Sequence, residues 1–230
     1  MNHWFKKAAA AVLLLALLVS AVGCSSLLKK KYIYSEAEDT LFVNDNGTIT
    51  KAVTSSFDKD YYSIEELTGI AQKMVLEFNQ KNYNYSYYSY DQMPKEDRES
   101  RLLPVSFESV KKTNDAVSIV FAYANGDCYT RFNLNEVQAL GGTKVYTNLV
   151  SRAITAGDIT PSMSFVSADG TKTISGADLE QNGNYIICSA DFPVNIYGAH
   201  EVAYVSPNVK VIAENGVTIG SNDTGYVIFK

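Results

Sequence analysis

Residues 105–123 read VSFESVKKTNDAVSIVFAY. Apolar side chains alternate along the second half of this stretch, and an extended chain presents them on one face: Val117, Ile119, Phe121 and Tyr123. The segment 105–111 can pair with 117–123 across the turn-forming residues Thr113-Asn114-Asp115. The stretch therefore predicts an antiparallel hairpin with one apolar face.

Asn-Gly and Asp-Gly pairs punctuate the rest of the chain, four of the first kind and one of the second. Such pairs tolerate the positive φ that two-residue hairpin turns require. Asn46-Gly47 is expected to join strands at 40–43 and 48–53, and Asn125-Gly126 to turn the chain into a further strand at 129–132. The density of these pairs indicates an antiparallel meander and argues against βαβ repeats.

The strongest helical pattern spans residues 64–80. Ser63 and Glu66 form a capping box in which each residue can satisfy a free backbone N–H at the start of a helix. Apolar side chains then recur at helical spacing and form one face, which we expect to lie on a sheet: Ile64, Leu67, Ala71, Met74, Val75 and Phe78.

The C-terminal part of the chain has the pattern of short strands separated by turns at 169–170, 182–183 and 215–216. Its clearest strands are expected at 185–188, 202–205, 209–212 and 226–229. The predicted fold class is therefore α+β: antiparallel β-meander and hairpins with one main amphipathic helix, followed by an all-β C-terminal half. We expect an α+β half over 39–135, a connecting segment over 136–160 and the β-rich half over 161–230. The sequence leaves open whether the two halves share one core.

The N-terminus predicts a secretory signal peptide over residues 1–23. Lys6 and Lys7 end a short basic region, and residues 8–22 follow without a charge. That run is shorter than the roughly 20 apolar residues of a membrane-spanning helix.

The signal sequence ends in Ala21-Val22-Gly23-Cys24, which resembles the lipobox of bacterial lipoproteins, although the family more often has Leu at the position of Ala21. The resemblance implies that Cys24 is acylated and becomes the N-terminus after cleavage. Residues 24–38 would then be the lipidated cysteine and a tether, with its lysines near anionic headgroups. The alternative is an ordinary signal peptide with an incidental cysteine.

The order of these segments resembles small uncharacterised lipoproteins of Gram-positive bacteria. The shared plan is a lipobox, a tether, the Asn-Gly hairpin and then Phe57-Asp58-Lys59-Asp60-Tyr61-Tyr62 before the capped helix. The resemblance implies a lipid-anchored protein on the extracytoplasmic face of the cell membrane, and it implies no particular activity.

The charge balance bears on possible partners. Both lysines of the leader leave with it, so the mature chain has 18 basic residues against 25 acidic ones. Nucleic acid requires a basic patch, so we expect no nucleic-acid partner.

The supply of catalytic side chains is small. His200 is the one histidine beyond the leader, no G-x-S-x-G motif is present, and no second histidine could complete a zinc site. Cys128 and Cys188 could form a disulfide, but we favour two unpaired buried thiols. We therefore expect no enzyme activity, no cofactor and no metal. A carboxylate-based hydrolase stays as a distant alternative, because many acids are present but none lies in a motif.

Residues 82–91 read NYNYSYYSYD. On an extended strand Tyr83, Tyr85 and Tyr87 would project from one face, and Tyr88 and Tyr90 from the other. Tyrosine mixed with Ser and Asn is typical of adaptable binding surfaces. These five tyrosines are the candidate residues for binding a ligand or partner; the alternative is an edge strand whose rings cover the end of the helix.

The most favoured function is a membrane-anchored, non-catalytic binding module that contacts an envelope protein or a glycan. The alternative is an accessory or structural subunit of a cell-envelope complex. An exposed aromatic patch would favour the first, and a large apolar interface the second.

Overall fold

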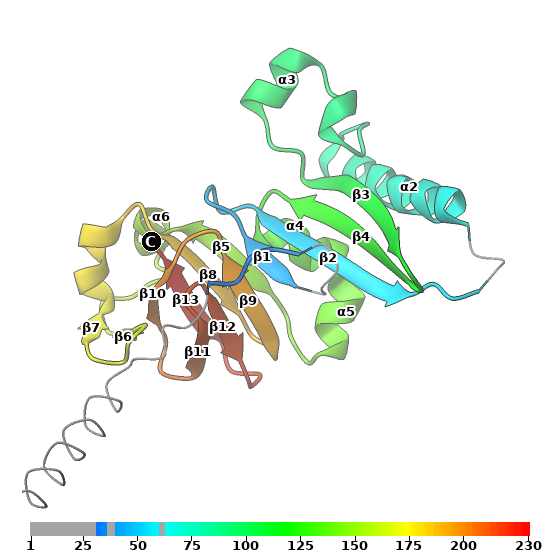
Figure 1. Ribbon diagram of the computed structural model, residues 1–230. Helices are drawn as coiled ribbons and strands as arrows, with labels where there is room; N and C mark the ends of the chain where they lie inside the picture. Colours follow the sequence, from blue (N-terminus) through cyan, green and yellow to red (C-terminus); the bar gives the residue numbers. More distant parts are fainter. Residues whose placement is uncertain (1–30, 36–39, 60–62) are drawn as a thin grey trace, which may run out of the picture. The chain divides into compact units, whose positions relative to one another are not determined.

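The computed structural model describes residues 31–35, 40–59 and 63–230. Residues 31–230 form one compact unit, and its described part contains thirteen strands in two sheets (Figure 1). A long helix lies among the N-terminal strands, and the C-terminal half is rich in strands. This confirms the predicted α+β class.

The first sheet has seven strands in the spatial order β11-β12-β9-β1-β2-β4-β3. Its strands are β1 (Leu41–Val43), β2 (Ile49–Ser56), β3 (Val105–Thr113), β4 (Ala116–Tyr123), β9 (Val194–Gly198), β11 (Val209–Ala213) and β12 (Gly216–Ile219). The hairpin predicted over 105–123 is confirmed: Thr113 lies opposite Ala116, and Asn114 turns the chain with a φ of 53°.

The second sheet has six strands in the spatial order β5-β8-β13-β10-β6-β7, all paired antiparallel. Its strands are β5 (Val145–Leu149), β6 (Ser164–Ser167), β7 (Thr173–Ser175), β8 (Ile186–Ala190), β10 (Val202–Val205) and β13 (Gly225–Phe229). Together with β11, these strands confirm the four clearest C-terminal strands that the sequence predicted.

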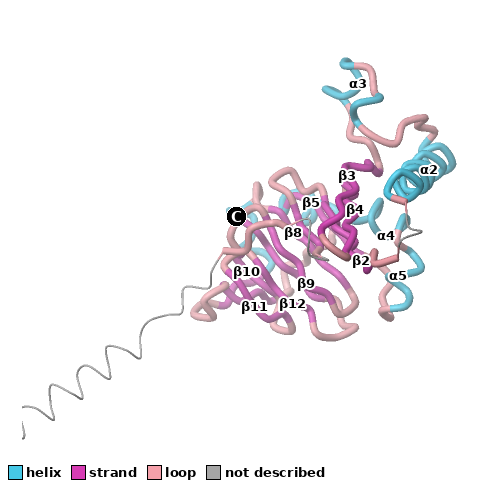
Figure 2. The backbone as a smooth tube through the Cα atoms, turned by 45° about the vertical axis from the view of Figure 1, so that its right-hand side comes forward, coloured by secondary structure: helices cyan, strands magenta, loops and turns pink. Residues whose placement is uncertain are grey.

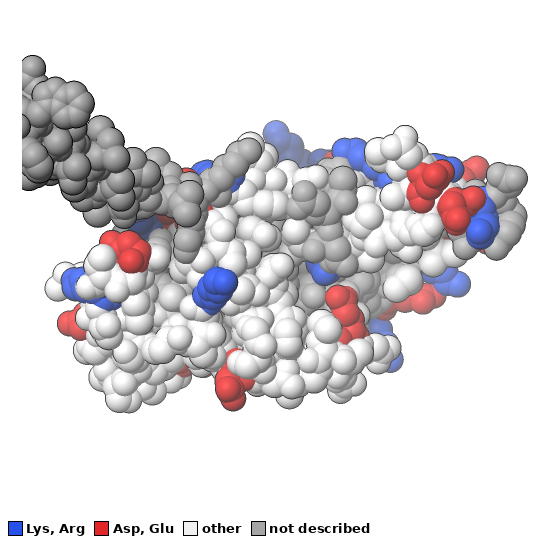
Figure 3. Space-filling model, turned by 60° about the horizontal axis from the view of Figure 1, so that its bottom comes forward, with Lys and Arg blue, Asp and Glu red and all other residues white. Residues whose placement is uncertain are grey.

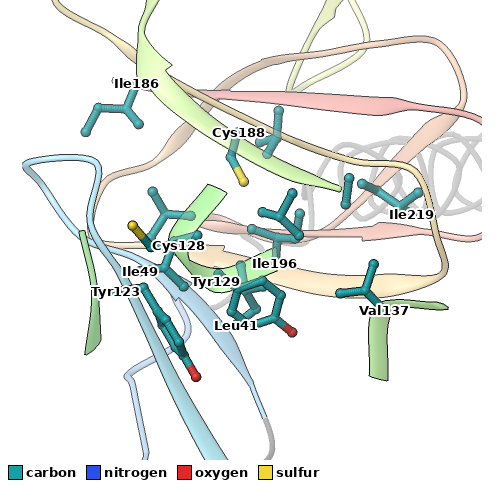
Figure 4. Packing of buried hydrophobic residues seen from close by; sticks show 14 of the residues in the cluster. Leu41, Ile49, Tyr123, Cys128, Tyr129, Val137, Ile186, Cys188, Ile196 and Ile219 are labelled. Atoms are coloured by element: carbon teal, nitrogen blue, oxygen red, sulfur yellow. The ribbon is translucent and has the colours of Figure 1, made fainter. Parts of the chain in front are cut away.

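The two expected halves share a sheet and a core. β1 from the N-terminal hairpin pairs in parallel with β9 from the C-terminal half, with Leu41 opposite Ile196. The segment 136–160, expected as a connection, contributes β5 to the second sheet. One hydrophobic cluster contains residues from both sheets (Figure 4), so the question that the sequence left open is answered.

The helices of the described chain are α2 (Ile64–Tyr83), α3 (Lys95–Ser100), α4 (Gly126–Phe132), α5 (Leu134–Ala139) and α6 (Val150–Ala156), with 3₁₀ turns η1 (Tyr90–Gln92) and η2 (Gly176–Asn182). The strand expected at 129–132 is wrong, because this segment belongs to α4. The side chain of Asn125 caps α4 and accepts a hydrogen bond from the Cys128 N–H at 3.0 Å. Asn is favoured both in turns and at helix N-caps, and here the cap prevails.

The Asn46-Gly47 hairpin is confirmed, but its loop is longer than the predicted two residues. The Asn44 N–H donates to the Thr48 carbonyl at 2.9 Å, and the Gly47 N–H donates to the Asn44 carbonyl at 3.0 Å. Gly47 has a φ of 80°. The loop therefore has three residues, with glycine in the left-handed position that such loops require.

Helix α2 lies against β3, as Figure 2 shows from the side. Its buried residues are Ala71, Val75 and Asn79, whereas Met74 of the predicted apolar face is 52% exposed. At about 100° per residue, Met74 and Asn79 lie on opposite flanks of the line through Ala71 and Val75. The helix is rolled towards Asn79, which is hydrogen-bonded inside the protein.

Strand β8 is buried on both faces because each face covers a separate core. Ile186 and Cys188 belong to the main core between the sheets and helices, and Ile187 belongs to a second core with α6. Cys128 and Cys188 are both buried and free, which confirms the favoured prediction of unpaired thiols. Both lie in the main core (Figure 4).

The described part of the expected tether contacts the first sheet. The Tyr32 N–H donates to Oδ1 of Asn215 at 2.7 Å, and Nδ2 of Asn215 donates back to the Tyr32 carbonyl at 3.0 Å. The Tyr32 ring stacks on that of Tyr197 in β9, with ring centres 3.9 Å apart. Tyr32 is thus fixed to the same sheet that β1 and β9 share.

Candidate functional site

The tyrosine segment, residues 83–90, is not the extended strand that the sequence predicted. Tyr83 is the last residue of α2, and Asn84 follows in the left-handed conformation with a φ of 59°. The N–H groups of Asn84 and Tyr85 donate to the last free carbonyls of the helix, those of Gln80 and Asn79. Asn is one of the few residues that adopt this cap conformation at low cost, so the chain reverses here and does not extend.

The segment is held in place from both sides. The Asn79 side chain donates to the Tyr87 carbonyl at 2.9 Å, and the Tyr88 carbonyl accepts a hydrogen bond from the Phe107 N–H in β3 at 2.7 Å. The backbone between α2 and η1 therefore has a defined path beside the edge of the first sheet.

Three of the five tyrosines have side chains that pack against other rings or form hydrogen bonds within the protein. Tyr83 packs against Phe78, and its hydroxyl accepts a hydrogen bond from the Cys128 thiol at 3.6 Å. Burial is the main cause that raises the pKa of Tyr83 above its usual value. The rings of Tyr88 and Phe107 form a T-shaped pair with centres 6.4 Å apart.

Tyr90 is the third. Its hydroxyl accepts a hydrogen bond from the Leu103 N–H at 2.9 Å, and burial raises the pKa of this phenol. A phenol fixed in this way positions the chain between η1 and β3.

Tyr85 and Tyr87 are half-buried and line an open pocket of about 400 Å³, which we name the Arg101 pocket. The remaining lining residues come from the same segment and from the region of α3: Tyr83, Asn84, Ser86, Asp97 and Arg101. Aromatic rings, amide, hydroxyl and both signs of charge therefore meet in one hollow.

A second pocket of about 360 Å³, which we name the Ser106 pocket, borders the end of the segment at Tyr88–Tyr90. Its lining residues come from α2, from the η1 region and from β3: Gln72, Tyr88, Ser89, Tyr90, Asp91, Gln92, Ser106, Phe107 and Glu108. The five predicted tyrosines are thus divided between two pockets. The other lining residues were missed by sequence reasoning, because they come from distant positions without a motif.

A third hollow of about 460 Å³ lies between α2 and the strands β2 and β4, and we name it the apolar groove. Its apolar lining residues are Val53, Phe57, Leu67, Ile70, Val117 and Ile119, and its polar ones are Ser55, Ser56, Ser63 and Glu66. Ile70 and the nearby Met74 are each about half exposed.

Other predicted residues contribute less to these sites. His200 is exposed in the bend between β9 and β10, as expected of a surface residue. Among the described residues no group of three or more His, Cys, Asp or Glu side chains is arranged to hold a metal ion. Cys24 lies outside the described residues. No helix within the described ranges is both long and apolar enough to cross a bilayer.

Figure 3 shows one face of the molecule, on which Lys and Arg side chains lie interspersed with Asp and Glu side chains. Large areas between them carry neither charge. The described basic side chains on this face do not gather into a single patch.

The fold and the three hollows define an α+β protein with a polar, tyrosine-lined surface at one end of α2. Comparison of the chain with protein-family models, curated proteins and solved structures finds no match.

Proposed function

We propose that this protein is a lipid-anchored, non-catalytic binding module of the cell envelope whose contact surface is the tyrosine segment. The observation that carries the proposal is the Arg101 pocket, where Tyr85 and Tyr87 border an open hollow. A tyrosine ring offers rigid apolar area with a hydrogen-bonding tip, which suits both sugar rings and protein surfaces. Three neighbouring tyrosines have structural contacts, so Tyr85 and Tyr87 are the ones available to a partner.

Two observations support a role without catalysis. His200 lies far along the chain from the tyrosine segment and lines neither pocket there. The carboxylates of the Ser106 pocket, Asp91 and Glu108, are exposed. Catalytic carboxylates usually lie in clefts that exclude water.

The lipid anchor is supported by the apolar leader that ends at Gly23-Cys24. One acyl chain binds a membrane only marginally, whereas two or more anchor a protein stably. Cys24→Ser is expected to leave the precursor uncleaved or to release the protein into the medium. A variant that fractionates and matures like the natural protein would contradict the anchor.

The contact surface is tested with Tyr85→Ala combined with Tyr87→Ala. We expect the melting temperature to change little, because neither residue makes the buried hydrogen bonds of its neighbours, and capture of envelope material to be lost. The matched control is Tyr185→Ala with Tyr204→Ala, two half-buried tyrosines that line neither pocket. The proposal fails if the first variant loses stability strongly, or if it captures envelope glycans and proteins as well as the control.

The second candidate is an accessory subunit of an envelope complex, and the apolar groove is the observation that favours it. Stable subunit contacts bury apolar surface. Ile70→Asp would place a charge in the lining of that groove, and we expect it to abolish co-purification of a protein partner. Unchanged co-purification would remove this candidate.

A further inference from the structure

The described part of the expected tether packs on one face of the first sheet through two rings. The Tyr32 ring stacks on Tyr197 of β9 with centres 3.9 Å apart, and the Tyr34 ring packs against Phe42 of β1 with centres 5.2 Å apart. Phe42 and Tyr197 are partners in the parallel pair of β1 and β9, so they are neighbours on the same face. Ile33, between the two tyrosines, is 81% exposed, as alternation along an extended segment requires.

The backbone of the tether is held by one buried side chain. The Asn215 amide, 0% exposed, forms reciprocal hydrogen bonds with the N–H and the carbonyl of Tyr32, and it also donates to the Gly198 carbonyl at 2.6 Å. The next residue is Gly216, where a Cβ would lie 2.4 Å from the Tyr197 ring. The Asn-Gly pair that the sequence predicted as a turn therefore also binds Tyr32. We name Tyr32, Tyr197 and Asn215 the tether clamp.

The tether clamp and the tyrosine segment lie on opposite sides of the first sheet (Figure 1). The clamp is on β9, whereas the tyrosine segment is bonded to β3 through the Tyr88 carbonyl and the Phe107 N–H. The strand order β9-β1-β2-β4-β3 places four strand intervals between them. Because neighbouring strands are 4.7–4.9 Å apart, β9 and β3 are separated by about 19 Å.

The chain between the expected lipid anchor and the clamp is short. Residues 25–31 separate Cys24 from Tyr32, so the two α-carbons are at most about 28 Å apart when this chain is fully extended. If both tyrosines left the sheet, the first strand residue would be Leu41 of β1, and its distance from Cys24 could reach about 60 Å. The docked segment therefore limits the reach of the tether to about half of that distance.

We propose that the end of the first sheet that carries the tether clamp is the membrane-facing surface of this protein, and that the clamp keeps it there. The tyrosine segment then lies at the far edge of the sheet, and its partner is located on the side of the protein away from the bilayer. This inference rests on the lipid anchor of the proposed function and adds the direction in which the contact surface faces.

The test uses the mature chain, residues 24–230, coupled through Cys24 to a maleimide lipid in phosphatidylcholine vesicles. Cys128 and Cys188 are 4% and 0% exposed, so the coupling is selective for Cys24. The mature chain has no tryptophan, because Trp4 leaves with the leader. One introduced tryptophan, excited where tyrosine does not absorb, is therefore a specific donor for energy transfer to dansyl-labelled lipid headgroups.

Two exposed positions on the opposite edge strands of the first sheet report the orientation. Lys210 lies in β11, two strand intervals from β9, and Thr113 lies in β3, four intervals away on the other side. We expect energy transfer from Lys210→Trp to be at least about twice that from Thr113→Trp, because transfer falls steeply over separations of this size. Equal transfer from the two positions, or stronger transfer from Thr113→Trp, overturns the inference.

The clamp is released by Tyr32→Pro combined with Tyr34→Ala. These changes remove both rings and the N–H that donates to Asn215, and they leave every strand unchanged. Transfer from Lys210→Trp should fall about twofold, because the reach of the tether doubles. The matched control is Ile33→Ala, which alters the exposed residue between the two tyrosines and should leave the transfer unchanged. Unchanged transfer after release overturns the role of the clamp.

Amide hydrogen exchange in the uncoupled mature chain tests the clamp without a membrane. The Tyr32 N–H donates to Asn215 at 2.7 Å, so its exchange should be slower than in an unstructured peptide of the same sequence. Equal exchange rates would show that the segment does not stay docked, and would overturn the inference.

The outcomes separate this inference from the proposed function, because the coupling supplies the anchor chemically. If Cys24→Ser fractionates like the natural protein in cells but Lys210→Trp transfers more strongly on vesicles, the orientation stands and the natural anchor is wrong. If the cellular anchor is confirmed but the two tryptophan positions transfer equally, the anchor stands and the orientation is wrong.

Discussion

The side-chain amide of Asn79 forms a two-way pair with the backbone of Val105. Its NH₂ group donates to the Val105 carbonyl at 2.7 Å, and its oxygen accepts from the Val105 N–H at 3.2 Å. The same NH₂ group donates to the Tyr87 carbonyl. One fully buried side chain therefore joins α2, the tyrosine segment and the first residue of β3.

Asn79→Ala should reduce the free energy of unfolding by about 3 kcal/mol, because it leaves several buried backbone groups unsatisfied at once. The midpoint of urea unfolding measures this loss. Asn82→Ala on the exposed side of the same helix is the control, since its amide donates to the Phe78 carbonyl within α2. Equal midpoints for the two variants would mean that the buried pair contributes little.

Alanine substitution should have opposite effects on stability at two helix glycines, Gly69 within α2 and Gly126 at the start of α4. A Cβ at Gly69 in α2 meets nothing within 4 Å, so Gly69→Ala should stabilise the protein by about 0.5–1 kcal/mol through helix propensity. A Cβ at Gly126 would lie 2.5 Å from the Val145 carbonyl oxygen in β5. Gly126→Ala must therefore displace backbone and should lower the melting temperature strongly. Similar melting temperatures for the two variants would contradict the close approach of α4 to β5.

Ser63→Ala should cost roughly 1 kcal/mol of stability. Ser63 Oγ accepts from the Glu66 N–H at 3.2 Å, which satisfies a donor that the first turn of α2 leaves free. The denaturant midpoint is again the measurement, and the exposed Ser56→Ala is the comparison. A midpoint equal to that of the comparison would show that the cap is unimportant.

Alkaline pH should destabilise the protein partly through Cys188. Burial raises the pKa of its thiol to about 12, whereas an unfolded cysteine ionises near pH 8.5. Above that pH the unfolded chain binds fewer protons than the folded one, so stability falls as pH rises towards the folded pKa. The loss is at most about 1.4 kcal/mol per pH unit for one thiol.

The measurement is the unfolding midpoint at intervals between about pH 7.5 and pH 9, below the range in which ordinary tyrosines ionise. Burial also raises the pKa of Cys128, so both thiols contribute. Cys188→Ala should therefore show a shallower decline than the natural chain, whatever its stability at neutral pH. Parallel declines would assign the pH dependence to other groups.

The strands were predictable where alternation and turn residues agreed. The β3–β4 hairpin satisfies both conditions, because one apolar face and a local turn determine the register. The strands near 185–188 and 226–229 do not alternate and were predicted as short apolar runs bounded by turn residues. Asn125 shows the limit of this reasoning, because its side chain suits a turn and a helix cap equally. The helix is favoured by the next residue, Gly126, which lies against Val145 and donates its N–H to the Thr147 hydroxyl. Strand β5 was missed because five residues between a glycine pair and a helix give too short a pattern.

Of the candidate site, the sequence could indicate only the unusual amino-acid composition of the tyrosine segment, and not its conformation or its neighbours. Tyrosine mixed with Ser and Asn marked a segment that borders two pockets, but Asn84 ends a helix there, so the tyrosines do not alternate as they would on a strand. The Ser106 pocket joins Gln72, the η1 region and a bulge at Glu108. A bulge has no sequence signature of its own, and which segments meet beside β3 depends on tertiary packing that one short window cannot contain.

The parallel pairing of β1 with β9 has a consequence for how the chain folds. Leu41 and Ile196 are neighbours in one sheet although most of the chain separates them. Closing so long a loop has an entropic cost that local hairpins avoid, so this pairing is expected to form late. Until β9 is present, β1 has a neighbour on one side only. An N-terminal fragment that ends before β9 therefore carries an open sheet edge, which is the kind of edge that promotes aggregation.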